Sequence, residues 1–122
     1  MVTTREQGQV TEKLAAQYLE NKGLKLLDQN FNSRFGELDL IMLDNENLVF
    51  VEVRYRRSNN FGSGAETITA SKQSKLMKTA SVYLQQHAKM NQYPARFDVV
   101  SISGSVETGK LEFNWIENAF GA

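Results

Sequence analysis

The sequence predicts an α+β fold in which helices flank a mixed sheet. Three observations lead to this class: an amphipathic helical segment comes first, three strands with short turns follow, and a second amphipathic helix precedes two closing strands. The predicted order is therefore αβββαββ. With 122 residues, one proline and no low-complexity stretch, we expect a single compact domain over residues 1–122.

The first predicted helix spans residues 4–22, where apolar side chains recur at helical spacing. Thr4 and Gln7 have the spacing of a capping box, in which two side chains satisfy the free N–H groups of the first turn. Gly23 follows the last turn and can adopt the left-handed conformation that ends many helices. These signals predict both ends of the helix.

The second predicted helix spans residues 72–88 and follows Ser71, which we interpret as its cap. Its apolar side chains share one face, and its lysines lie mostly opposite them. His87, the single histidine, falls on the apolar side near the end. We interpret it as a packing residue, or as a residue that favours the C-terminal end of the helix dipole, rather than as a metal ligand.

The predicted strands alternate apolar and polar residues or form short apolar runs. In chain order they cover residues 24–31, 36–43, 48–56, 95–103 and 110–116. The polar segment 57–69 is longer than most connections, which makes it a candidate functional loop. On the closing strands we interpret Asp98 as a structural ion-pair partner of Arg96, and Trp115 as a core residue.

Overall composition excludes few functions. Fourteen Lys and Arg residues balance fourteen Asp and Glu residues, so net charge alone predicts no polyanionic partner. The absence of cysteine excludes a disulfide framework and a thiolate metal site. Because no secretory signal and no apolar run of about 18 residues occurs, we expect a soluble cytoplasmic protein that does not enter a membrane.

Two strands of the predicted meander each carry an acid in the middle of an apolar run. The stretch is "GELDLIMLDNENLVFVEVRYRR", residues 36–57. If "DNEN" forms the turn, Asp39 lies opposite Glu52 and Glu37 lies opposite Arg54, all on one face. Like charges opposite one another in a sheet repel by up to ~1 kcal/mol. We therefore expect a bound proton or cation to compensate the repulsion between Asp39 and Glu52.

Two compensating arrangements fit this pair of acids. The carboxyl groups could share a proton, or both could bind a hard divalent cation such as Mg²⁺ or Mn²⁺. In the second case Arg54, two residues after Glu52, could stabilise the charge of a phosphate group. The competing interpretation is a solvated sheet face on which Glu37 and Arg54 form an ordinary ion pair of small energetic value.

The sequence resembles the YraN-like family of small bacterial proteins. The motifs that carry the resemblance are "GQVTEKLAAQYLENKG", "NF" at residues 30–31, "FGELDLI", "FVEVRYR", the lysine-bearing second helix, "RFDVV" and "NAF", which together span nearly the whole chain. That family is similar to the PD-(D/E)XK nuclease superfamily and, within it, to the archaeal Holliday junction resolvases. The resemblance implies a restriction-endonuclease-like core.

The resemblance also implies roles for individual residues. Asp39 and Glu52 match the metal-ligating acids, and the backbone carbonyl of Val53 would be a further ligand. Glu12 matches an additional helix acid of the resolvase-like branch. Arg54 stands where the superfamily has a lysine. The implied catalytic set is therefore Asp39, Glu52, Arg54 and Glu12, with Mg²⁺ or Mn²⁺ as cofactor.

Arg54 is a departure with chemical consequences. Arginine stays charged, so it can hold a phosphate group but cannot act as a base. Lys72 on the second helix could instead reach the acids. Glu12 can be considered independently of the resemblance: it shares a helical strip with small residues that would let the sheet approach, although helix glutamates are usually solvated.

Three functions compete. The first is a metal-dependent nucleic-acid phosphodiesterase acting on branched or structured DNA; the second is a nucleic-acid-binding module without catalysis; the third is a protein-interaction module. For the first two we expect phosphate contacts from Arg56, Arg57, Lys72 and Lys75. Cutting both strands of a junction would need two active sites and so a homodimer, which no residue here demonstrates.

Overall fold

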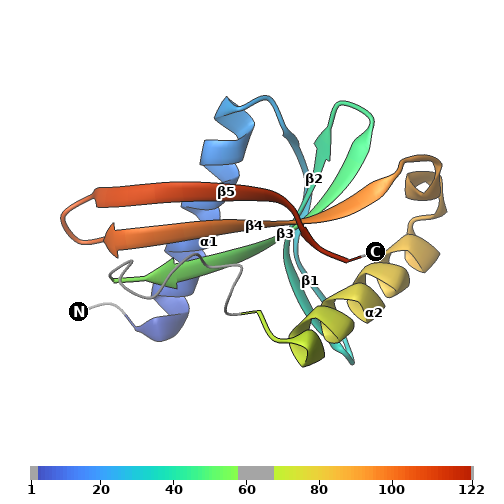
Figure 1. Ribbon diagram of the computed structural model, residues 1–122, viewed down its shortest axis with the longest axis horizontal. Helices are drawn as coiled ribbons and strands as arrows, with labels where there is room; N and C mark the ends of the chain where they lie inside the picture. The colour runs from blue at the N-terminus through green and yellow to red at the C-terminus, as the bar shows by residue number, and fades with distance from the viewer. Residues whose placement is uncertain (1–2, 58–67, 122) are drawn as a thin grey trace.

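The structure is a computed structural model that describes residues 3–57 and 68–121 of the chain. Figure 1 shows one sheet with two long helices. In chain order the elements are α1 (Thr4–Asn21), β1 (Lys25–Ser33), β2 (Gly36–Asp44), β3 (Asn47–Arg56), α2 (Ala70–Gln86), the 3₁₀ helix η2 (Ala88–Gln92), β4 (Ala95–Ser105) and β5 (Lys110–Phe120). The predicted α+β class and the order αβββαββ are confirmed. Most of the predicted loop at 57–69 lies outside the described residues.

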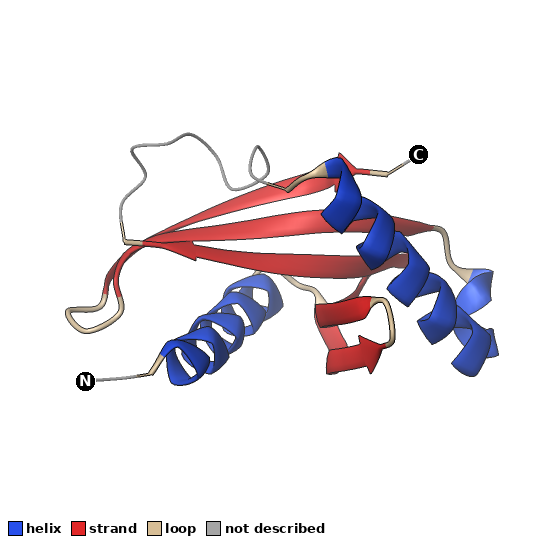
Figure 2. Cartoon of the chain, turned by 90° about the horizontal axis from the view of Figure 1, so that it is seen from below, coloured by secondary structure: helices blue, strands red, loops and turns tan. Residues whose placement is uncertain are grey.

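The sheet has five strands in the order β1-β2-β3-β4-β5. Neighbouring strands are antiparallel except β3 and β4, which run parallel, so the sheet is mixed as predicted. Parallel neighbours cannot be joined by a tight turn and need a crossover. Helix α2 is part of that crossover, and Figure 2 shows both long helices against the sheet.

The core is divided between the two faces of the sheet, with one helix on each. Leu48 and Phe50 of β3 pack with α2, whereas Val49 and Val51 pack with α1. This division follows from the alternation of side chains along a strand. All four side chains are at most 1% exposed, and burying each contributes roughly 1.5–3 kcal/mol. No helix within residues 3–57 and 68–121 is long and apolar enough to cross a membrane.

Helix α1 begins at Thr4, as predicted, but its cap is one residue earlier than predicted. Thr3, not Thr4, is the cap: its Oγ1 accepts a hydrogen bond from the Glu6 backbone N–H at 3.1 Å. The Thr3 hydroxyl also contacts the Glu6 carboxylate, which lies favourably at the positive end of the helix dipole. Gly23 ends the helix as predicted, with a positive φ of 101°.

Helix α2 begins earlier than predicted. Thr69, not Ser71, is the cap, and its Oγ1 accepts from the Lys72 backbone N–H at 3.1 Å. Thr69 is the last residue with extended backbone angles before the helix, and this conformation defines a cap. At the other end His87 stacks on Tyr83, with ring centroids 4.1 Å apart, which confirms its packing role.

The predicted register of the β2–β3 hairpin is confirmed over most of its length. Paired residues run from Asp44 with Asn47 to Leu40 with Val51. Asn45 in the turn has a φ of 55°, a left-handed conformation that asparagine tolerates better than most residues. The ladder stops at Leu40, so the predicted backbone pairs of Asp39 and of Glu37 on β3 fall beyond its end.

The hairpin of β1 and β2 bends where this ladder stops. Leu38 packs on the α2 side together with Ile41, whereas Leu40 packs on the α1 side. Regular alternation would place residues 38 and 40 on one face. The prediction that the acids of β2 continue one regular face is therefore wrong at this point. In β1, Asn30 has a φ of 52°, so both strands are distorted here.

Candidate metal centre

Asp39 and Glu52 meet at the point where β2 separates from β3. The Asp39 Oδ2 atom accepts a hydrogen bond from the Val53 backbone N–H at 2.9 Å. The Asp39 carboxyl group is also hydrogen-bonded to the carboxyl group of Glu52. Glu52 itself is only 6% exposed. The predicted encounter of the two acids is confirmed, but it is made by side chains beyond the end of the ladder.

The environment of Asp39 favours its protonated form. Burial raises the pKa of Asp39 to about 9, and the hydrogen bond to Glu52 and the Glu52 charge act in the same direction. The Val53 N–H opposes them in part because it stabilises the carboxylate. A carboxyl group with this pKa holds its proton at neutral pH. In the cation-free protein, a proton on Asp39 therefore removes the like-charge repulsion between Asp39 and Glu52.

Two further acids approach Asp39 from the side of α1. Carboxylate oxygens of Glu12, Glu37 and Asp39 all lie within 4.8 Å of one another. The side-chain amide of Asn30 donates to Glu12 at 2.8 Å and to Glu37 at 2.9 Å. We call Glu12, Glu37, Asp39 and Glu52 the acidic site.

Glu12 reaches this position because of the residues around it on α1. Ala15, Ala16 and Leu19, which belong to the same helical strip, are buried against the sheet. Their small or flat contact surfaces let the sheet approach the helix, as the sequence predicted. Glu12 is half buried at the border of that strip. The prediction that its carboxylate can reach the Asp39 region is confirmed.

Lys72 approaches the acidic site from α2. Its Nζ lies 2.7 Å from Glu52 Oε2, and the Lys72 side chain is 45% exposed. The contact is an ion pair, yet its direction is poor for a hydrogen bond, and the buried Oε2 atom has no well-directed donor. A buried carboxylate oxygen in this condition carries a desolvation cost that a further positive partner would offset.

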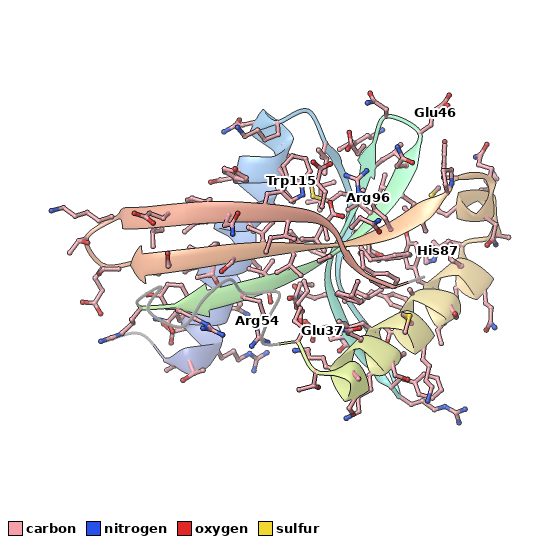
Figure 3. The ribbon with its side chains drawn as sticks, viewed as in Figure 1. Glu37, Glu46, Arg54, His87, Arg96 and Trp115 are labelled. Atoms are coloured by element: carbon pink, nitrogen blue, oxygen red, sulfur yellow. The ribbon has the colours of Figure 1, made fainter. Side chains whose placement is uncertain are left out.

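The other predicted cations are placed differently. Arg54 lies on β3 opposite Ser101 of β4, and Figure 3 shows it with Glu37 in the region between α1 and the start of α2. Arg54 and Arg56 are half buried and both take part in polar or ring contacts, whereas Arg57 and Lys75 are exposed. Lys72 is thus in contact with the acidic site through Glu52, whereas Arg57 lines a pocket with Gly104 and Ser105 near the β4–β5 turn.

The whole of the acidic site falls within a region shared with known proteins. Residues 11–102 match the family described as "Uncharacterised protein family UPF0102". The chain belongs to UPF0102. A UPF0102 protein of Vibrio parahaemolyticus is 48% identical over 119 residues, which cover 98% of this chain and 95% of that protein. UPF0102 proteins of Nitrosomonas europaea and Stutzerimonas stutzeri are 47% and 46% identical, each over 120 residues and 98% of both chains.

The sequence patterns do not predict the contacts of two residues at the acidic site of this UPF0102 chain, Glu37 and Asn30. Glu37 was predicted to face Arg54, but it lies with Glu12 and Asp39. Asn30 belongs to the "NF" motif of the resemblance, which implied no role for it. The available signal was an asparagine in the middle of a predicted strand, since asparagine is depleted in strands but tolerates left-handed backbone.

The predicted metal ligands of the UPF0102 chain, Asp39, Glu52 and Val53, stay a prediction, and the structure shows their contacts. Asp39 belongs to the close group of three acids, whereas Glu52 contacts Asp39 and Lys72. Val53 contacts Asp39 through its N–H, and its carbonyl as a ligand stays a prediction.

Asp98 and Trp115 have structural roles in the UPF0102 chain. Asp98 is fully buried and pairs with Arg96 at 3.0 Å, as predicted. It also accepts from the Trp115 indole N–H at 2.9 Å and from the Asn118 backbone N–H at 2.9 Å. Trp115 packs against the cluster under α1, which confirms it as a core residue. Figure 3 shows Arg96 and Trp115 close to each other near the crossing of the strands.

Proposed function

We propose that this protein is a metal-dependent nucleic-acid phosphodiesterase with endonuclease activity. The observation that carries the proposal is the buried contact between Asp39 and Glu52, with Glu12 and Glu37 beside it and Lys72 on its other side. A chain selected for stability alone would avoid gathering four acids at one point. The resemblance to the PD-(D/E)XK superfamily supports the same reaction class.

The donor set suits Mg²⁺ or Mn²⁺. All four side chains offer carboxylate oxygens, the ligands that these hard cations prefer. A cation near Asp39 would replace the proton on Asp39 and would give the buried Glu52 Oε2 atom the positive partner that it lacks in good geometry. Such an ion supplies charge stabilisation for the phosphodiester and a water that is easily deprotonated.

The remaining groups of the site are assigned to the substrate. Lys72 Nζ, next to Glu52, is placed to orient the attacking water or to hydrogen-bond a phosphate oxygen. Arg54 holds phosphate charge, because a guanidinium does not act as a base. Arg56, Arg57 and Lys75 contact flanking phosphates. Branched or structured DNA is the substrate that the resemblance to the resolvases favours.

A cleavage assay tests this proposal. Supercoiled plasmid, single-stranded DNA and a synthetic four-way junction are incubated with protein and Mg²⁺, Mn²⁺ or EDTA. We expect cation-dependent cleavage that Asp39→Asn and Glu52→Gln each abolish. Glu46→Gln is the matched control, because Glu46 is an exposed acid in the turn between β2 and β3, away from Glu37 in Figure 3. Cleavage that persists in Asp39→Asn would contradict the proposal.

A second function is a nucleic-acid-binding module without catalysis. The observation that favours it is the pairing of Lys72 with Glu52, because a lysine held in an ion pair is less available for chemistry, and Arg54 cannot replace it as a base. This function predicts DNA binding that is unchanged in Asp39→Asn, together with no cleavage by the wild type under any cation.

A further inference from the structure

A cavity of about 550 Å³ lies between the β1–β2 turn and the outer surface of α2. This volume is within the range of pockets that hold small ligands. Strand β1 contributes Asn32, the turn contributes Arg34 and Phe35, and α2 contributes Lys78, Gln85 and Gln86. None of these side chains belongs to the acidic site.

One wall of this cavity carries an aromatic ring, Phe35, that two cationic side chains contact. The Arg34 guanidinium carbon lies 4.8 Å from the centre of the Phe35 ring, and Lys78 Nζ lies 5.6 Å from it. Phe35 is only half buried, so its ring is within reach of a ligand. Aromatic rings and guanidinium planes stack with nucleobases, and both cations can hold phosphate.

The charge around the cavity is one-sided although the whole chain is neutral. Residues 68–97 contain no acidic residue, and α2 carries Lys72, Lys75 and Lys78. Three residues along a helix correspond to a rise of about 4.5 Å. The three lysines therefore form a series along α2 that begins at Glu52 and ends at the Phe35 ring. Such a series favours a polyanion that extends from the acidic site to the cavity.

The cavity also adjoins the acidic site through the β1–β2 turn. Asn32 lines this cavity and also a neighbouring one of about 430 Å³ that contains Glu12 and Glu37. The hydroxyl groups of Ser33 and Thr79 are 2.9 Å apart and join the turn to α2. This contact fixes the turn against α2. Figure 1 shows β1 and β2 running beside α2.

We propose that this cavity binds one unpaired nucleotide of the nucleic-acid substrate. The base stacks against Phe35 or the Arg34 guanidinium, the amides of Asn32, Gln85 and Gln86 face its hydrogen-bonding edge, and Lys78 holds the adjoining phosphate. A paired base is not accessible in this way because it stays stacked inside the duplex. The inference rests on the proposed function and adds a substrate class to it: nucleic acid with an unpaired segment next to the cleavage site.

Binding of labelled oligonucleotides tests the inference without cleavage. Fluorescence anisotropy in EDTA compares a 16-nucleotide single strand with the blunt duplex of the same sequence. We expect Phe35→Leu, which keeps an apolar side chain but removes the ring, to weaken single-strand binding roughly 5-fold or more, the loss typical of one stacked base. Duplex binding should change less than about 2-fold.

Two further variants separate a nucleotide site from a folding effect. Ser81→Leu adds volume at the cavity wall from an exposed helix position and leaves Phe35 unchanged, so it should weaken single-strand binding in the same way. Lys78→Gln removes the cation that is proposed to hold the phosphate. Its matched control is Lys110→Gln, which removes a charge at the start of β5, at the end of the molecule away from α2 in Figure 1. Thermal melts of each variant report folding.

The outcomes distinguish this inference from the proposed function. Equal losses on single strand and duplex, an unaffected Ser81→Leu, or a Lys110→Gln that loses as much as Lys78→Gln would each overturn the nucleotide site. Cation-dependent cleavage could still be present in those cases, and the proposed function would stand. If instead the wild type binds single strands through Phe35 but never cleaves them, the nucleotide site holds and the phosphodiesterase does not.

Discussion

At the scale of single residues, the half-buried carboxyl group of Asp39 is central to the proposed function. Asp39 accepts the Val53 N–H through one oxygen and is hydrogen-bonded to Glu52, and these contacts exist only because β2 separates from β3 there. A protonated aspartic acid and an asparagine have nearly the same shape, and both can accept one hydrogen bond and donate another. Asparagine is therefore a close substitute for Asp39 in the cation-free state and a poor one when a cation is bound.

This substitution predicts a pH-dependent difference in stability. The pKa of Asp39 is about 9 in the folded protein and near 3.8 in the unfolded chain. Its contribution to stability is complete below pH ~4 and is lost as pH rises toward ~9, because only the unfolded form ionises readily in that window. Asp39→Asn cannot ionise, so its stability relative to wild type should rise from pH 5 to pH 9.

Urea unfolding in EDTA at pH 5, 7 and 9 measures this difference. Near pH 7 we expect Asp39→Asn to be more stable than the wild type, because ionisation of Asp39 stabilises the unfolded wild-type chain and asparagine cannot ionise. The exposed Glu46→Gln serves as control and should show no such trend. A difference between Asp39→Asn and wild type that is the same at all three pH values would contradict a protonated Asp39.

Substitutions of Arg54 and Lys72 test whether these cations take part in the proposed cleavage reaction. Arg54→Lys should preserve or raise nuclease activity, because lysine keeps the charge and restores the donor typical of the superfamily. Arg54→Ala and Lys72→Ala should leave cation binding largely intact but lower turnover by about 10²-fold or more, the usual effect of removing a charge stabiliser. Single-turnover cleavage rates measure this. Full activity in Arg54→Ala would remove Arg54 from the mechanism.

At the scale of elements, the sequence predicted which segments are helices and strands and how β2 pairs with β3. The apolar periodicity predicts the elements. Together with the position of the "DNEN" turn it also predicts the pairing of residues 40–44 with β3. The predicted cap residues are wrong by one residue for α1 and by two for α2, because several hydroxyl residues lie near each start and the backbone conformation decides which one caps. The sequence does not predict the bend at Asp39 or the left-handed conformation of Asn30 beside it, because neither changes the pattern of hydrophobicity.

The acidic site was predictable to a similar extent. The meeting of Asp39 with Glu52 follows from the register, and the approach of Glu12 follows from its helical strip. The ion pair of Lys72 with Glu52 was one of several options, because the placement of α2 on the sheet depends on packing far along the chain.

Two exposed cations predict a salt-dependent interaction. Arg57, which directly follows β3, and Lys75 on α2 are exposed, so their loss should not disturb the core. If both contact phosphates, Arg57→Gln and Lys75→Gln should each weaken DNA binding and reduce the slope of log affinity against log salt by about 1. Anisotropy titrations from low to moderate salt measure the slope. An unchanged slope would favour a protein-interaction module.

At the scale of the whole molecule, cation binding should be coupled to folding. The acidic site is assembled from α1, β2 and β3, with Lys72 from α2, so it exists only when these elements are packed together. A ligand that binds only the folded state stabilises it by mass action. Because the cation would displace the proton on Asp39, its affinity should also rise with pH between 6 and 9.

Thermal melts with and without Mn²⁺ test this coupling. The wild type should gain stability with added Mn²⁺, more at pH 8 than at pH 6, and Asp39→Asn should gain much less at either pH. A wild type whose melting temperature is indifferent to Mn²⁺ and Mg²⁺, next to a destabilised Asp39→Asn, would show that the acids are structural hydrogen-bond partners and would end the metal hypothesis.

The parallel pairing of β3 with β4 has a consequence for the time course of folding. Leu48 pairs with Ala95 and Arg56 with Ser103, so every contact of this ladder joins residues 47 positions apart. Closing so long a loop costs chain entropy before any pairing is gained, whereas the hairpins of β1, β2 and β3 close over short turns. We therefore expect the meander with Asp39 and Glu52 to form early and the α2 crossover to dock late. Until that docking brings Lys72 beside Glu52, the nascent protein holds its acids together without their cationic neighbour.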